Sequence, residues 1–121
     1  MLERFFTRRK LEKVGLKYIN VTNSAIEKYR DFVKDNKEEN LSDMLIKINR
    51  NYQCSNVTRE FKHHIEKCYG NLVIKYSKDD DIIYDIYNNR GKTIGLYIDK
   101  SIKDKYDAVL NKDKVGVLCV E

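Results

Sequence analysis

The 121-residue sequence has no run of about 20 apolar residues, the length that a helix needs to cross a bilayer. It also lacks the glycine-rich phosphate-binding loops and the nucleophile-elbow motif that mark several large enzyme classes. Proline is absent altogether, and this absence by itself indicates no function. We therefore expect no membrane partner, and we expect a binding protein rather than an enzyme with a recognisable nucleophile triad.

Cysteine is scarce, with three residues that lie far apart in the sequence, Cys54, Cys68 and Cys119. Three thiols cannot all pair within one chain and none belongs to a C-x-x-C motif, which favours a reducing, cytoplasmic compartment. Cys54 lies between a strand-like apolar run and a helical pattern, so it is a candidate metal ligand or nucleophile. The alternative is a small side chain packed under a loop. Cys68 lies on an apolar helical face and is expected in the core.

Positive charge is concentrated at one end of the chain. The net charge is +5, and residues 1–17 alone carry +4 of it. Within this segment cations are interleaved with two aromatic residues, in the order Arg4, Phe5, Phe6, Arg8, Arg9 and Lys10. Such a pattern can bind nucleic acid through phosphate contacts and base stacking. It can also be an organelle-targeting helix, or a surface helix packed by its phenylalanines.

The apolar periodicity predicts one α+β domain with a mixed or antiparallel sheet and covering helices. Residues 1–15 are expected to form a basic amphipathic arm ended by Gly15, and residues 16–121 the domain. The expected elements of the domain are strand 16–21, a helix opening at 22–24, strand 44–48, helix 57–69, strands 72–76, 82–87 and 93–98 as a meander, a helix from Ser101, and strand 115–120. The aspartates of residues 79–81 lack the ligand pattern of a calcium loop, and they are expected in a hairpin turn.

Four segments of the sequence carry a resemblance to a known family. They are Ile19–Ala25, Leu45–Ile48 leading to Cys54-Ser55, Asp80–Tyr84, and Gly91–Asp99 with the sequence G-K-T-I-G-L-Y-I-D. Together they resemble the HesB-like family, which includes the IscA-type iron–sulfur carriers. Asn56 stands where the family has glycine, and the family's C-terminal C-G-C pair is missing, with only Cys119 near the end of the chain.

The resemblance implies a HesB-like fold with Cys54 as the ligand that is carried over for an iron–sulfur cluster or iron. One thiolate cannot hold a cluster alone, so Cys119, a partner chain or an exogenous ligand would complete the site. The function that follows is a small intracellular binding or accessory protein with a degenerate metal site, bound to a protein partner or to itself. The alternative is a nucleic-acid- or ribonucleoprotein-associated protein that docks through its basic arm.

Overall fold

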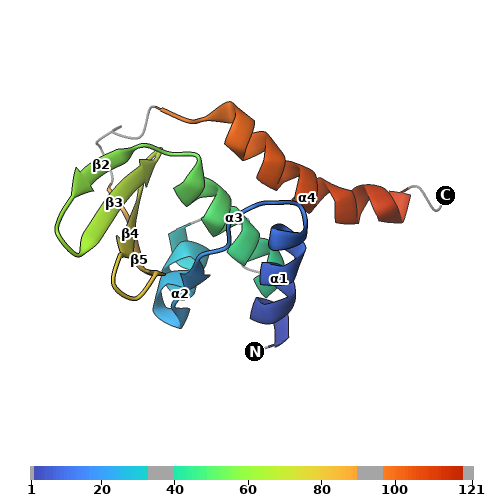
Figure 1. Cartoon of the computed structure of the whole chain (residues 1–121), viewed down its shortest axis with the longest axis horizontal. Coiled ribbons are helices and arrows are strands. Elements are labelled where there is room, and N and C mark those ends of the chain that lie inside the picture. Colours follow the sequence, from blue (N-terminus) through green and yellow to red (C-terminus); the bar gives the residue numbers. More distant parts are fainter. Residues whose placement is uncertain (1, 33–39, 90–96, 119–121) are drawn as a thin grey trace.

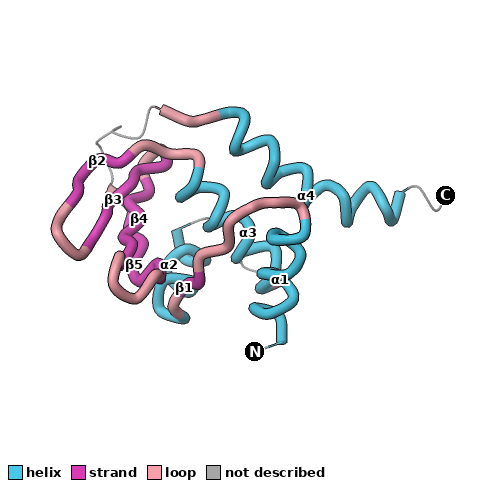
Figure 2. The backbone as a smooth tube through the Cα atoms, viewed as in Figure 1, coloured by secondary structure: helices cyan, strands magenta, loops and turns pink. Residues whose placement is uncertain are grey.

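A computed structural model describes residues 2–32, 40–89 and 97–118, with side chains described to residue 111. The helices and strands alternate irregularly along the chain (Figures 1 and 2). In order they are α1 (Leu2–Lys13), β1 (Asn20–Val21), α2 (Asn23–Phe32), α3 (Leu41–Gln53), β2 (Val57–Glu60), β3 (His64–Tyr69), β4 (Leu72–Ser77), β5 (Ile82–Asn88) and α4 (Lys100–Leu118). Among these described helices, none is both long enough and apolar enough to cross a membrane.

The five described strands form one mixed sheet in the order β1-β5-β4-β3-β2. Strands β2 to β5 form an antiparallel meander, and the short β1 pairs in parallel with β5. Gly70, in the turn between β3 and β4, has φ +60°, a backbone conformation that glycine adopts without steric cost. This sheet confirms the predicted α+β class and the strands expected at 72–76 and 82–87. Most of the strand expected at 93–98 lies outside the described residues.

The helices lie on one side of the sheet, with α3 between the sheet and α1 (Figure 1). The inner face of the sheet contributes Ile74, Ile83 and Ile86 to the core. From α3, Met44, Leu45, Ile46 and Ile48 are all fully buried in the same core. A helix buried on most of its circumference lies at the centre of a domain, because its apolar residues are then covered from several directions.

The strand predicted at 44–48 is wrong, because these residues lie within α3. The helix begins after Asn40, whose side-chain oxygen accepts a hydrogen bond of 2.8 Å from the backbone N–H of Asp43. A short apolar run such as Met44–Ile48 fits a buried strand and a buried helix equally well. The N-cap at Asn40 and the burial of Met44–Ile48 on several sides therefore favour the helix over the strand.

The helix predicted at 57–69 is also wrong, because this segment forms the hairpin of β2 and β3. Phe61, expected on the buried helical face, lies in the hairpin turn and is 47% exposed. The side chains of β3 alternate between the two faces of the sheet, so the helical spacing of Phe61, Ile65 and Cys68 is coincidental. Cys68 is buried, as predicted, although on a strand.

The C-terminal strand predicted at 115–120 is replaced by helix as far as the structure describes it, because residues 115–118 belong to α4. Residues 119 and 120 lie outside the described part of the chain. Tyr106 of α4 is buried, and its hydroxyl donates a hydrogen bond of 2.6 Å to the carbonyl of Lys17. This bond fixes α4 on the segment that leads into β1.

The chain between α1 and β1 is held on α3 by one buried amide. The side-chain oxygen of Asn49 accepts a hydrogen bond of 2.6 Å from the backbone N–H of Ile19, and its nitrogen donates to the Ile19 carbonyl at 3.0 Å. Asn49 is fully buried, so it replaces a strand partner that these backbone groups would otherwise lack. As a result only Asn20 and Val21 of the predicted strand 16–21 pair with the sheet.

Candidate functional site

Helix α1 has two faces of different character. Thr7 and Leu11 are fully buried, and the helix packs on α3, where the Thr7 hydroxyl donates a hydrogen bond of 2.9 Å to that of Ser42. On the other side Phe5 is 52% and Phe6 57% exposed. The helix therefore buries small or aliphatic side chains and leaves its two largest apolar side chains in solvent. Gly15, with φ +80°, ends the helix as predicted.

Arg4 serves to attach α1 to the rest of the domain. Its guanidinium donates hydrogen bonds to the side-chain oxygen of Asn20 at 2.7 Å and to that of Asn23 at 2.6 Å. A third bond goes to the backbone carbonyl of Val21. Since these bonds occupy much of its donor capacity, we assign Arg4 a positioning role, although the sequence marked it as a nucleic-acid contact.

Arg8 and Arg9 lie on the exposed part of α1. The guanidinium carbon of Arg9 is 5.6 Å from the ring centroid of Phe5, a cation–π distance, and the Phe5 and Phe6 rings meet edge to face at 5.7 Å. Arg8 pairs with Glu12 at 3.4 Å, and both side chains are more than half exposed. An exposed ion pair of this kind is weak and exchanges readily for another anion.

Lys10, the fourth basic residue marked by the sequence, is half-buried beside the exposed face. It lines an open hollow of about 740 Å³ with Phe6, Arg9, Glu12 and Lys13. Cations thus surround the exposed ring of Phe6 and outnumber the one carboxylate. We call the exposed residues Phe5, Phe6, Arg8, Arg9 and Lys13 the α1 outer face.

A second hollow, of about 410 Å³, lies between α1 and the turn that joins β4 to β5. Its walls carry both signs of charge together with aromatic and amide groups. The lining residues are Arg4, Phe5, Arg8, Tyr18, Asn20, Asp80 and Asp81. Burial raises the pKa of Tyr18, and the neighbouring Arg4 and Arg8 partly oppose that rise.

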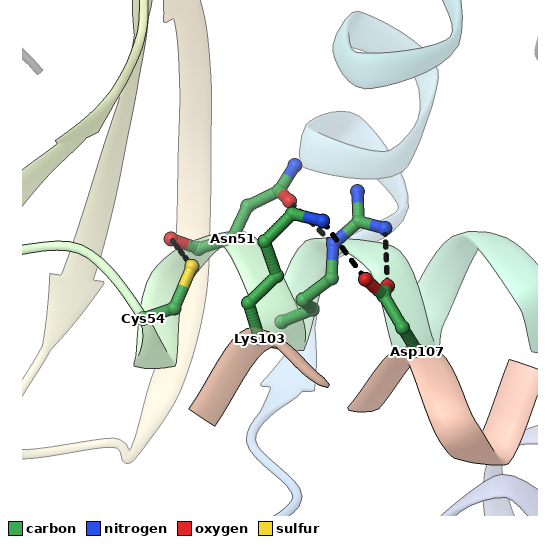
Figure 3. A network of polar contacts seen from close by, with 5 residues as sticks. Asn51, Cys54, Lys103 and Asp107 are labelled. Carbon is green, nitrogen blue, oxygen red and sulfur yellow. Dashed lines mark hydrogen bonds and ion pairs between the residues drawn. The ribbon is translucent and has the colours of Figure 1, made fainter. Parts of the chain in front are cut away.

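Cys54, the candidate metal ligand, caps the C-terminus of α3 and is fully buried (Figure 3). Its Sγ lies 3.9 Å from the carbonyl oxygen of Asn51, a weak hydrogen bond. Burial raises the pKa of the thiol, an effect that the charge of Arg50 opposes. Because a metal ligand must be a thiolate, this environment disfavours the metal-binding form.

The described part of the chain gives no set of metal ligands around Cys54. Among these residues no group of three or more His, Cys, Asp or Glu side chains is arranged to hold a metal ion. Cys119, the other candidate ligand, lies outside the described residues. The segment Leu45–Ile48, which the resemblance treats as the strand before the metal ligand, is helical, so this part of the resemblance has no counterpart in the structure.

Beside Cys54, an ion-pair network joins α3 to α4 (Figure 3). Asp107 accepts hydrogen bonds from Arg50 and from Lys103, each at 2.8 Å. Burial alone would raise the pKa of Asp107, but the hydrogen bonds from Lys103 and Arg50 outweigh it and lower that pKa. The guanidinium of Arg50 also lies 5.9 Å from the ring centroid of Tyr69. Each of these three charged side chains has a partner of opposite charge, so we assign the network the role of holding α4 on α3.

Sequence reasoning missed one further cation. Lys67 projects from β3 toward the helices, and its ammonium lies 4.3 Å from the ring centroid of Tyr52. Burial lowers its pKa. Residues 64–69 show no strict alternation of polar and apolar side chains, so the sequence gives no local signal for this strand, and the helix predicted for 57–69 placed Lys67 wrongly.

Comparison with protein families, with curated proteins and with solved structures found no match in any of the three. The function of the chain is therefore inferred from its own side chains.

Proposed function

We propose that this protein binds single-stranded nucleic acid through the α1 outer face. The observation that carries the proposal is the exposure of Phe5 and Phe6, at 52% and 57%, beside the cations Arg8, Arg9 and Lys13. Stacking of bases on exposed aromatic rings, combined with cations that contact phosphates, is how proteins commonly bind single strands. The rigid attachment of α1 by Thr7, Leu11 and Arg4 would present these groups without a cost in ordering.

The iron–sulfur proposal has less support. It needs a thiolate at Cys54, and this side chain is fully buried with a raised pKa. It also needs a second ligand, for which Cys119 remains the candidate within the chain. A protein purified without metal and then supplied with ferrous iron and sulfide would show cluster absorbance if this proposal held.

A titration with labelled single-stranded RNA tests the nucleic-acid proposal. The double variant Arg8→Ala/Arg9→Ala should bind about tenfold more weakly at low salt, and the dependence of log K on log salt should become shallower by about 1.4, since each single-strand phosphate contact contributes about 0.7. The variant Phe5→Ala/Phe6→Ala should lose about as much affinity with an unchanged salt slope, because stacking involves no counterion release.

The matched control removes two positive charges elsewhere. Lys62, in the turn before β3, and Lys100, at the start of α4, are both exposed and lie outside the α1 outer face. The variant Lys62→Ala/Lys100→Ala should bind RNA within about twofold of the wild type at moderate salt. Equal losses in the control and in the Arg8/Arg9 variant would reduce the proposal to unspecific charge attraction, and absence of RNA binding by the wild type would remove it.

A further inference from the structure

The hollow between α1 and the β4–β5 turn is contiguous with the α1 outer face, because Phe5 and Arg8 belong to both. Its volume of about 410 Å³ falls within the usual range of about 300–1,000 Å³ for sites that hold a small organic ligand. A strand bound along α1 would therefore pass a recess large enough for one nucleotide.

The two walls of this recess differ in chemistry. On the α1 side, the half-exposed ring of Phe5 offers a stacking surface, and Arg8 offers a cation whose ion pair with Glu12 is exposed to solvent. On the opposite side, Asp80 and Asp81 offer carboxylates. A cation and an aromatic ring on one wall suit a phosphate and the flat face of a base, whereas carboxylates suit hydrogen-bond donors on the edge of a base.

Asp81 is held in a defined orientation. Its φ of +50° is uncommon for a residue with a side chain, and one carboxylate oxygen accepts a hydrogen bond of 2.5 Å from the Tyr76 hydroxyl. Burial and the neighbouring Asp81 raise the pKa of Tyr76 to about 12, so the hydroxyl remains a donor at neutral pH. An ionised carboxylate has about four acceptor positions, and Tyr76 uses one of them.

Among the bases, guanine fits this arrangement. Its Watson–Crick edge presents two adjacent donors, the ring N–H and the exocyclic amino group, which one carboxylate can accept together. Adenine and cytosine place an acceptor nitrogen beside their amino group, and this lone pair would face the carboxylate oxygens. Uracil offers one donor between two carbonyl oxygens. Charge and hydrogen-bond complementarity therefore select guanine at a carboxylate.

We propose that the recess lined by Phe5, Arg8 and Asp81 binds a guanine base of a single-stranded nucleic acid, with the base stacked on Phe5 and its edge on Asp81. This inference rests on the proposed function of the α1 outer face and adds a base preference to it.

The experiment compares two ten-nucleotide RNAs, an oligouridine and the same strand with one central guanine, by fluorescence anisotropy. The wild type should bind the guanine-containing strand about tenfold more tightly, as expected for one good bidentate contact to a base. Replacement of guanine by inosine, which lacks the exocyclic amino group, should give an intermediate affinity. A central adenine should give no gain over uridine.

The variant Asp81→Asn should abolish the gain from guanine and leave the affinity for oligouridine within about twofold. Asparagine tolerates a positive φ, and it replaces one acceptor oxygen by a donor. Asp79→Asn is the matched control, because Asp79 lies in the same turn, pairs with His63 at 2.7 Å and does not line the recess. It should keep the preference for guanine. A melting curve for each variant shows that the fold is intact.

The failures are distinguishable. If the wild type binds neither RNA, both the proposed function and the guanine site are overturned. If it binds both strands equally, with a dependence on Arg8 and Arg9, the α1 outer face stands and the guanine site is overturned. Equal loss of the guanine preference in Asp79→Asn and Asp81→Asn would also overturn the site, because the effect would then reflect charge alone.

Discussion

Two regions of this protein place an arginine over an aromatic ring at nearly the same distance. Arg9 lies 5.6 Å from the ring of Phe5 on α1, and Arg50 lies 5.9 Å from the ring of Tyr69 between α3 and the sheet. Arg50 also pairs with Asp107 at 2.8 Å, and only 15% of its side chain is exposed. On α1, by contrast, the ring and its cation both face solvent.

The same pair of groups therefore has two roles. In the α3–α4 contact the cation is committed to a neighbouring carboxylate, and its loss would be felt as a loss of stability. On the α1 outer face the ring and the cation are not needed to hold the fold. A bound partner would cover the exposed apolar surface of the ring. The difference predicts that substitutions in the α3–α4 contact change stability, whereas substitutions on the α1 outer face change binding.

The largest effect on stability should come from the inner side of α1. Leu11→Ala removes a fully buried side chain and should lower the free energy of unfolding by about 3 kcal/mol. Phe6→Ala, on the same helix, removes a larger side chain that is 57% exposed and should change it by less than about 0.5 kcal/mol. Urea denaturation of both variants measures this contrast.

A loss of stability in Phe6→Ala as large as in Leu11→Ala would mean that the α1 outer face is structural. Complete deletion of residues 1–15 tests the same point less cleanly. The sequence alone predicts an arm at residues 1–15 outside the domain of residues 16–121, which implies that the domain stays folded without this segment. Because Thr7 and Leu11 are fully buried and α1 packs on α3, the structure leads us to expect a clear loss of stability instead.

The next effect should come from the ion-pair network. Asp107→Ala leaves Arg50 largely buried without its carboxylate and should cost about 2 kcal/mol, less than a fully buried pair because these side chains keep some contact with water. Asp104→Ala removes an exposed carboxylate from the same helix and should cost less than about 0.5 kcal/mol. Thermal unfolding at neutral pH compares the two variants.

The network also predicts a dependence on pH. The pKa of Asp107 is lowered in the folded protein, so its stabilising effect is complete above the ordinary carboxyl pKa of about 4 and is lost as the pH falls through the folded-state pKa. Between pH 5 and pH 3 the wild type should therefore lose more stability than Asp107→Ala does. Parallel curves for the two proteins would show that the pair contributes nothing.

The parts of the fold that the sequence predicted correctly carry local signals that tertiary contacts reinforce. Gly15 ends α1 because glycine adopts the positive φ that a helix end needs. Strands β4 and β5 are joined by a charged turn at residues 78–81, and Ile74, Ile83 and Ile86 from these strands fill the inner face of the sheet. Helix α2 begins at the predicted position, and Thr22 caps it, because its side-chain oxygen accepts a hydrogen bond of 3.1 Å from the Ala25 N–H.

The errors arose where local patterns fit two structures. Met44–Ile48 is apolar except for Lys47, and five residues are too few to separate a strand period from a helical one, whereas Phe61, Ile65 and Cys68 match a helical spacing by chance. The candidate guanine site could not be predicted from the sequence, for a different reason. Arg8 and Asp81 are far apart in sequence, and nothing local to either residue shows that α1 packs beside the β4–β5 turn.

The smallest effect should come from the two described cysteines, Cys54 and Cys68, which are both buried. The sequence alone places Cys68 in the core and Cys54 at a loop, which implies that Cys68→Ala is more destabilising than Cys54→Ala. Cys54 and Cys68 are 0% and 2% exposed, so we now expect each substitution to cost on the order of 1 kcal/mol.

Thiol labelling then tests whether the Cys54 thiol is inaccessible to reagents in the folded protein. In the variant Cys119→Ser the remaining thiols should react with an aromatic disulfide reagent only as fast as the protein opens, because burial shields Cys54 and raises its pKa. Addition of denaturant should make both react at once. Rapid reaction of one thiol in the folded protein, assigned to Cys54 by its absence in Cys54→Ala, would show an accessible thiolate, and the metal-binding proposal would regain the ligand that it needs.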